Sequence, residues 1–193
     1  MTDRTTREHI VAAADGLFYR QGYEFTSFAD IAEAVQISRG NFYYHFKSKD
    51  DILDAVIDVR LTNTRNMLEQ WERENEDPAE RIKSYIRILI TNWSKIRKFG
   101  CPVGTLCAEL AKLNHASRKE ASGVFTLFRT WLCQQFTLLG RKKDADALAM
   151  RVLAWSQGVA TMASTFRDET FTRQEVKRMC NWVDSCARTT RLS

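Results

Sequence analysis

The sequence predicts an all-α fold of about nine helices, and three observations carry that prediction. Apolar residues recur three and four positions apart over long segments, which is the spacing of one face of an α-helix. Glycine and proline, which interrupt helices, number only 8 and 2 among 193 residues. No segment of the sequence alternates apolar and polar residues as a half-buried strand would.

Three short helices are expected at the N-terminus. The first runs over residues 5–21 and ends at Gly22, where a left-handed backbone costs glycine nothing. Thr26 or Ser27 caps the second helix, and Ser38, after a tight turn, caps the third, because a hydroxyl oxygen accepts a hydrogen bond from a free helical N–H group.

The remainder of the chain predicts longer helices. A fourth helix begins after Ser48 and runs to the acidic stretch that ends at Asp77. Further breaks are expected at Gly100, Asn114 and Gly140. The helices beyond the fourth are expected at residues 79–98, 102–113, 117–139, 143–164 and 173–189.

Charge is distributed unevenly along the chain. The formal net charge is +5, but residues 1–60 carry seven Lys or Arg and ten Asp or Glu, a net charge of −3. A nucleic-acid partner is therefore permitted, provided that the N-terminal part binds it with locally focused charge. Only charges on the docking face matter, since salt screens the others over about 10 Å.

Several classes of protein are disfavoured by composition. No apolar run approaches the roughly 20 residues that cross a bilayer, and no secretory signal is recognisable, so a cytoplasmic location without membrane contact is expected. The five cysteines are an odd number and are expected to be free thiols. The three histidines lie far apart and no CxxC motif occurs, so neither a metal site nor a cofactor is expected.

Residues 26–46 have the spacing of a helix-turn-helix. The small Ala32 permits close helix packing, Ile37 fills the turn, and Phe42 anchors the second helix from behind. Side chains at the start of that helix then project outward, where such motifs read base edges: Ser38, Arg39, Gly40 and Tyr43. Donors suited to phosphate surround them: Tyr44, His45, Lys47 and Lys49.

The block from Gly22 to Leu53 resembles the TetR/AcrR family of bacterial regulators, most specifically in the segment Arg39–Lys49, RGNFYYHFKSK. The resemblance implies a DNA-binding domain at residues 1–48 and an effector-binding and dimerisation domain at 49–193. It implies phosphate contacts by two residues at helix starts (Thr26 and Lys49), base-edge contacts by three (Ser38, Arg39 and Gly40), and backbone contacts by three more (Tyr43, Tyr44 and His45). Tyr43 and Tyr44 could instead be core aromatics, and Arg4 and Arg7 either contact phosphate or are simply solvated.

The resemblance also implies a homodimer that binds a palindrome in double-stranded DNA. The last two predicted helices would form the interface through apolar residues that could equally be core: Leu148, Val152, Trp155, Val159, Val176, Met179, Trp182 and Val183. An unidentified small-molecule effector would lie among the central helices, with these candidates around it: Trp71, Trp93, Phe125, Phe128, Trp131 and Met162.

Cys101 stands directly before Pro102, and proline is favoured in the first turn of a helix. A cysteine at the helix start, with basic residues upstream at Lys95, Arg97 and Lys98, would have a lowered thiol pKa and greater reactivity. The Gly-Cys segment also resembles a branch of the family that responds to electrophiles, oxidants or unsaturated small molecules. Cys107 is then a candidate resolving thiol. The alternative is that Cys101 is a small buried residue.

The sequence therefore predicts a ligand-responsive transcriptional regulator, a repressor released from its operator by a small molecule or by thiol modification. An alternative is a helical interaction protein that keeps the fold without specific operator binding. A second is a thiol-dependent enzyme using Cys101 and His115. No Ser/His/Asp set or phosphate-binding glycine loop is present, so the chain is not expected to be an enzyme.

Overall fold

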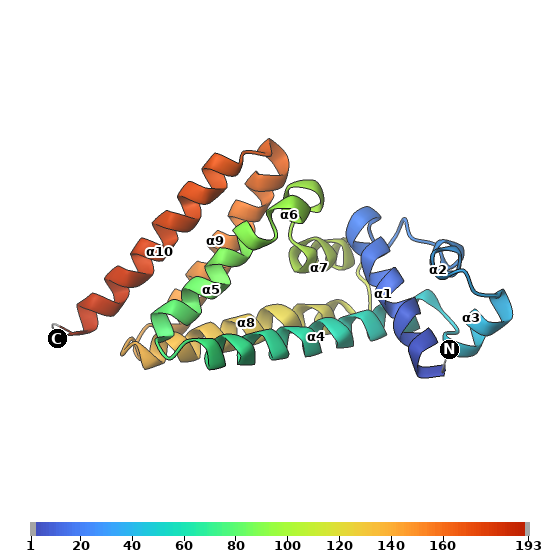
Figure 1. Ribbon diagram of the computed structural model, residues 1–193, viewed down its shortest axis with the longest axis horizontal. Coiled ribbons are helices and arrows are strands. Elements are labelled where there is room, and N and C mark those ends of the chain that lie inside the picture. The colour runs from blue at the N-terminus through green and yellow to red at the C-terminus, as the bar shows by residue number, and fades with distance from the viewer. Residues whose placement is uncertain (1–2, 192–193) are drawn as a thin grey trace. The chain divides into compact units, whose positions relative to one another are not determined.

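The computed structural model describes the backbone of residues 3–191 and the side chains of residues 5–38 and 40–187 (Figure 1). Within that range the chain forms ten α-helices and no strand, which confirms the all-α prediction. The helices are α1 (Asp3–Gln21), α2 (Phe28–Val35), α3 (Arg39–His45), α4 (Lys49–Glu74), α5 (Pro78–Thr91), α6 (Trp93–Phe99), α7 (Pro102–Lys112), α8 (Arg118–Leu138), α9 (Ala145–Phe166) and α10 (Glu169–Arg191).

The helix count differs from the prediction at one place. The helix expected over residues 79–98 is divided at Asn92, whose φ of −101° and ψ of 17° end α5 and start α6. No proline or glycine marks this break, and Asn92, a residue type that favours helix ends, is its only local signal. The predicted breaks at Gly100, Asn114 and Gly140 are all present, each with a positive φ.

The chain divides into two compact units. The N-terminal unit contains residues up to 63 together with 102–123, and the helical unit contains 64–101 together with the residues from 124 onward. Helix α4, of 26 residues, contributes its first part to one unit and its second part to the other. Helix α7, although late in the sequence, belongs to the N-terminal unit.

A single hydrophobic core holds the N-terminal unit together. Ile10, Ile31, Phe42 and Ile52, from the first four helices, are almost completely buried in it. Later residues enter the same core: Leu106 and Leu110, one helical turn apart on α7, and Ala121 on α8. Because a buried aliphatic or aromatic side chain contributes about 1.5–3 kcal/mol, α7 is a structural member of this unit.

In the helical unit, α5 packs against α9 and α10, and α6 packs against α9. Aromatic pairs join α8 to the others: the Phe128 ring centroid lies 4.9 Å from that of Tyr85, and the Phe136 centroid 6.0 Å from that of Trp182. Tyr85 is buried and its hydroxyl is hydrogen-bonded to Ser156 at 2.9 Å. Burial raises the pKa of Tyr85, so this hydroxyl stays protonated.

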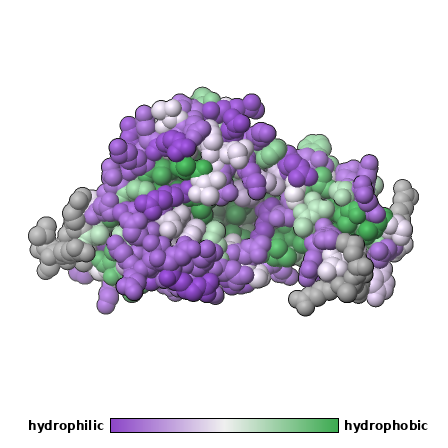
Figure 2. Space-filling model, viewed as in Figure 1, coloured by the Kyte–Doolittle hydropathy of each residue, from purple (hydrophilic) through white to green (hydrophobic). Residues whose placement is uncertain are grey.

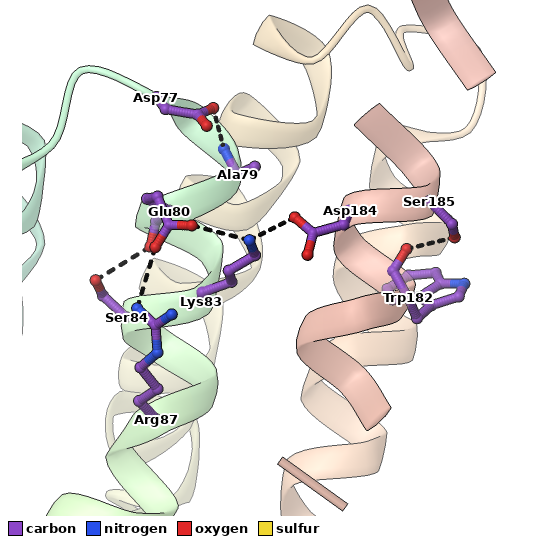
Figure 3. Close-up of polar contacts among 9 residues, drawn as sticks. All are labelled: Asp77, Ala79, Glu80, Lys83, Ser84, Arg87, Trp182, Asp184 and Ser185. Carbon is purple, nitrogen blue, oxygen red and sulfur yellow. Dashed lines mark hydrogen bonds and ion pairs between the residues drawn. The ribbon is translucent and has the colours of Figure 1, made fainter. Parts of the chain in front are cut away.

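A charged cluster fastens α5 to α10 (Figure 3). The Lys83 ammonium donates to Glu80 at 2.8 Å and forms an ion pair with Asp184, while Arg87 reaches Glu80 at 3.2 Å. Burial alone would lower the pKa of Lys83, but the hydrogen bonds to Asp184 and Glu80 raise it above its ordinary value. The same contact with Lys83 lowers the pKa of Glu80. Lys83 is therefore charged and paired between two helices that are far apart in sequence.

The visible face of the molecule is mostly hydrophilic, with hydrophobic patches that include one over the α2–α3 region (Figure 2). Among the described residues no helix is long and apolar enough to cross a membrane. No group of three or more His, Cys, Asp or Glu side chains in this part of the chain is arranged to hold a metal ion.

Candidate DNA-binding surface

Side-chain caps define both helices of the helix-turn-helix. The Ser27 hydroxyl accepts from the Asp30 amide at 3.1 Å, and the Asp30 carboxylate accepts from the Ser27 amide at 2.7 Å. These hydrogen bonds lower the pKa of Asp30 and complete a capping box. Of the two caps expected for α2, Ser27 is thus the one used. Ser38 caps α3 as predicted, with its hydroxyl accepting from the Asn41 amide at 3.3 Å.

The inner side of the motif is apolar, as its spacing predicts. Phe42 is 1 % exposed, and the Phe28 ring packs edge-on against it with centroids 4.6 Å apart. Ala32 and Ile37 are partly buried against the same core. Phe42 therefore fixes α3 from behind and leaves the opposite side of this short helix facing outward.

The outer side of α3 exposes aromatic and small residues. Tyr43 is 51 % and Tyr44 69 % exposed, so neither is a core residue. Gly40 is also exposed, and no described atom lies within 4 Å of a Cβ placed on it. His45 is half-buried and lies edge-on to Tyr44, with centroids 5.2 Å apart. The residues predicted to contact base edges, Ser38, Gly40 and Tyr43, are thus all exposed along the outer side of this helix and its cap.

Four basic residues that were predicted to contact DNA are placed differently or lie outside the described side chains. The side chains of Arg4 and Arg39 lie outside the described residues, although the backbone of Arg39 begins α3. Arg7 is exposed, with its guanidinium 4.9 Å from the centre of the Phe46 ring. The Lys47 ammonium donates to the Tyr43 carbonyl oxygen at 2.6 Å, at the C-terminal end of α3.

Thr26 and Lys49, for which the resemblance implies phosphate contacts, bond to the backbone of their own chain. Thr26 is completely buried and its hydroxyl donates to the Gly22 carbonyl at 2.6 Å. The Lys49 ammonium donates to the Tyr23 carbonyl at 3.0 Å and lies 4.2 Å from the centre of the Tyr23 ring. Both side chains therefore hold the turn between α1 and α2 in this conformation, because that turn leaves backbone carbonyls to be satisfied.

The effector candidates occupy different environments. Phe128 and Trp131 are buried on α8, and the Trp131 indole N–H donates to Glu72 at 2.8 Å. Trp71 packs on Trp131 with centroids 5.7 Å apart, whereas Trp93 and Phe125 are half-buried. Met162 is exposed, so it does not line an interior space in this chain. The buried hydrogen bond between Tyr85 and Ser156 was not predicted. Helical spacing with Ile82 and Ile86 could have indicated that Tyr85 is buried, but nothing local indicates Ser156.

The two cysteines singled out from the sequence belong to different units. Cys101 ends a segment of the helical unit, directly before Pro102, which is the first residue of α7 as predicted. Cys107 packs against the core of the N-terminal unit. All five cysteines are free thiols.

Comparison with known proteins gives two family matches. Residues 10–56 match bacterial regulatory proteins of the tetR family, and residues 78–175 match the C-terminal domain of transcriptional regulators like LmrA and YxaF. An HTH-type transcriptional regulator in the lacX 3′ region of Lactococcus lactis subsp. lactis is 30% identical over 139 residues, 70% of each chain.

Two further proteins are similar over nearly the whole length. The HTH-type transcriptional regulator YxaF of Bacillus subtilis is 24% identical over 174 residues, which are 88% of this chain and 91% of YxaF. The crystal structure of a TetR transcriptional regulator from Legionella pneumophila is 25% identical, with a TM-score of 0.79 over 92% of this chain and 95% of that one.

Proposed function

The chain belongs to the TetR family of bacterial transcriptional regulators, and on that premise we propose that α3 reads a palindromic operator in double-stranded DNA. It is a DNA-binding transcriptional regulator of the ligand-responsive kind, for which repression is the typical mode. The observation that carries the proposal is the accessible end of α3, where Gly40 and Tyr43 are exposed while Phe42 anchors the helix.

Each residue predicted to contact DNA around α3 has a chemical role in this proposal. Arg39, as the first helical residue, carries a guanidinium that can donate to both O6 and N7 of a guanine. Gly40 lets the backbone approach the base edges, and the Ser38 hydroxyl proton is available to a base or phosphate acceptor. Tyr43, Tyr44 and His45 then contact the sugar-phosphate backbone.

Selection of bound fragments from random double-stranded DNA tests this function. We expect a palindrome to be enriched, and Arg39→Ala to lower affinity for it by about tenfold or more while relaxing the preference at one base pair of each half-site. Arg65→Ala removes an exposed arginine of α4 in the helical unit and serves as the matched control. No enrichment at low salt would overturn the proposal and leave the helical interaction protein as the reading of the chain.

We further propose that the chain acts as a homodimer, in the cytoplasm, through the outer face of α9. Six of the eight predicted interface residues are buried within a single chain: Leu148, Val152, Val159, Val176, Met179 and Val183. The large hydrophobic residues left exposed on α9 are instead Met150, Met162 and Phe166. Gly158 is exposed between the two methionines, two helical turns after Met150 and one before Met162, and lets a second helix approach closely.

Gly158→Leu tests the dimer without disturbing the protomer. No described atom lies within 4 Å of a Cβ at this position, and the position is exposed, so there is open space for the side chain to begin. Sedimentation velocity is expected to show a folded monomer with lowered operator affinity. Ala111→Leu, exposed on α7, is the control for an added leucine. A dimer of unchanged stability in Gly158→Leu would exclude this face.

We propose Cys101 as the thiol whose modification releases the operator. Its support is its position directly before Pro102, the first residue of α7. An electrophile is expected to release wild-type protein and the Cys180→Ser control from DNA, but not Cys101→Ser. Equal release from all three would assign the response elsewhere. Turnover that depends on Cys101 in a protein without specific DNA binding would instead support an enzyme.

A further inference from the structure

The turn between α1 and α2 gathers backbone donors on one side. Gly22 has a φ of +91°, and the residues that follow it, Tyr23 and Glu24, present successive amide N–H groups to a common point. Successive N–H groups after a left-handed residue form a concavity that binds an anion. In residues 22–26, called the α1–α2 turn below, the amides of Tyr23 and Glu24 therefore favour an anionic hydrogen-bond acceptor.

That partner is the carboxylate of Glu109 on α7. One oxygen accepts from the Tyr23 amide at 2.9 Å, and the other accepts from the Glu24 amide at 2.9 Å. Hydrogen bonds to an ionised acceptor are about twice as strong as neutral ones. The fit is close, because a Cβ placed on Gly22 would lie 2.9 Å from the nearer Glu109 oxygen.

The carbonyl side of the same turn is held from α4. Lys49 donates to the carbonyl oxygens of Tyr23 at 3.0 Å and Glu24 at 3.5 Å. The Tyr23 side chain adds a third attachment, since its hydroxyl donates to Asp50 and lies 3.2 Å from a ring nitrogen of His115. The amides of Tyr23 and Glu24 thus bond to α7 and their carbonyls bond to α4, and the turn leads directly into the Ser27 cap of α2.

Helix α7, which carries Glu109, follows directly in sequence on a segment of the helical unit. Its first residue, Pro102, follows Cys101, the last residue of a helical-unit segment, and Leu106 and Leu110 anchor it in the N-terminal core. We propose that Glu109 is a positioning residue for operator binding, which sets the α1–α2 turn, and through it the start of α2, according to the placement of α7. This inference rests on the proposed function, because operator affinity is one of its readouts.

The test compares Glu109→Gln with Glu120→Gln, the same change at an exposed position of α8 in the same unit. A glutamine side chain can accept only one of the two N–H groups and presents its own N–H to the other. We expect the operator Kd of the active fraction of Glu109→Gln to rise about tenfold. Amide hydrogen exchange at Tyr23 and Glu24 should accelerate, and Glu109→Asp should restore part of the affinity.

Two results would overturn the inference. One is equal operator affinity in Glu109→Gln and Glu120→Gln. A smaller active fraction of Glu109→Gln with an unchanged Kd counts in the same way, because loss of stability alone would produce it. The other is rapid exchange of the Tyr23 and Glu24 amides in the wild-type protein, a measurement that does not depend on the folding of any variant. Failure of the wild-type chain to select any operator would instead refute the proposed function, while the amide exchange would still report on the Glu109 contact.

Discussion

The charged contacts at the α1–α2 turn of the N-terminal unit differ from those of the Lys83 cluster in the helical unit. In the first, Glu109 and Lys49 bond to the backbone of a turn, at 2.9 Å and 3.0 Å. In the second, Lys83 bonds to the side chains of Glu80 and Asp184 and joins two long helices (Figure 3). The backbone N–H and C=O groups of the α1–α2 turn need hydrogen-bond partners from side chains, which also fix the turn. The backbone groups of α5 and α10 are hydrogen-bonded within each helix, so the Lys83 cluster serves only to position one helix against the other.

The largest expected effect is a loss of stability when one buried phenylalanine is replaced by alanine in the core of either unit. Phe42→Ala in the N-terminal unit and Phe136→Ala in the helical unit each remove a fully buried ring and should cost about 3–5 kcal/mol of unfolding free energy. Operator binding should be lost in Phe42→Ala with dimerisation retained, and dimerisation should be weakened first in Phe136→Ala. Thermal unfolding and sedimentation velocity measure both. Identical losses in the two variants would show that the units do not fail independently.

An intermediate effect is expected where the helical unit depends on its charged cluster. Lys83→Met leaves Asp184 without its partner and should cost about 1–2 kcal/mol at neutral pH, less than for a fully buried pair because the carboxylates are partly exposed. Chemical denaturation measures the loss, and Lys95→Met, at an exposed position of α6, is the control.

The pH dependence of that difference follows from the two pKa shifts. Because the pKa of Lys83 is raised, its contribution is complete below the ordinary value of 10.5 and is lost as the pH rises through the folded-state pKa. The pKa of Glu80 is lowered, so its contribution is present above 4.5 and is lost as the pH falls through the folded-state value. A stability difference that grew above pH 10.5 would contradict the assignment.

The smallest effect on stability has the opposite sign. Gly40→Ala places a methyl group in open space on α3 and should stabilise the helix by about 0.5–1 kcal/mol. Operator affinity should nevertheless fall, because the methyl group separates the backbone from the base edges. Gly16→Ala on α1, where the new Cβ meets only the end of the flexible Arg20 side chain, is the matched control. Unchanged affinity in Gly40→Ala would mean that α3 does not approach DNA at this point.

Local patterns were sufficient for the helices and for the motif. The caps Ser27 and Ser38, the anchor Phe42 and the break at Gly100 follow from residue types within a few positions of one another. The division at Asn92 was missed, because asparagine disfavours a helix interior but no neighbouring glycine or proline strengthens that preference into a predicted break. Burial of the α9 and α10 residues also needed the fold, because helical spacing alone does not distinguish core from interface.

By itself the sequence determined an all-α chain, a capped helix-turn-helix and a family resemblance, because each depends on neighbours along the chain. Only the tertiary structure decided that α7 belongs to the N-terminal unit and that Glu109 bonds to Tyr23, 86 residues away. It also turned Thr26 and Lys49 inward, onto the same turn. Contacts of this kind depend on which backbone N–H groups a folded turn leaves without an acceptor. They also depend on which distant side chain the packing of the core places beside those groups, and local residue spacing predicts neither.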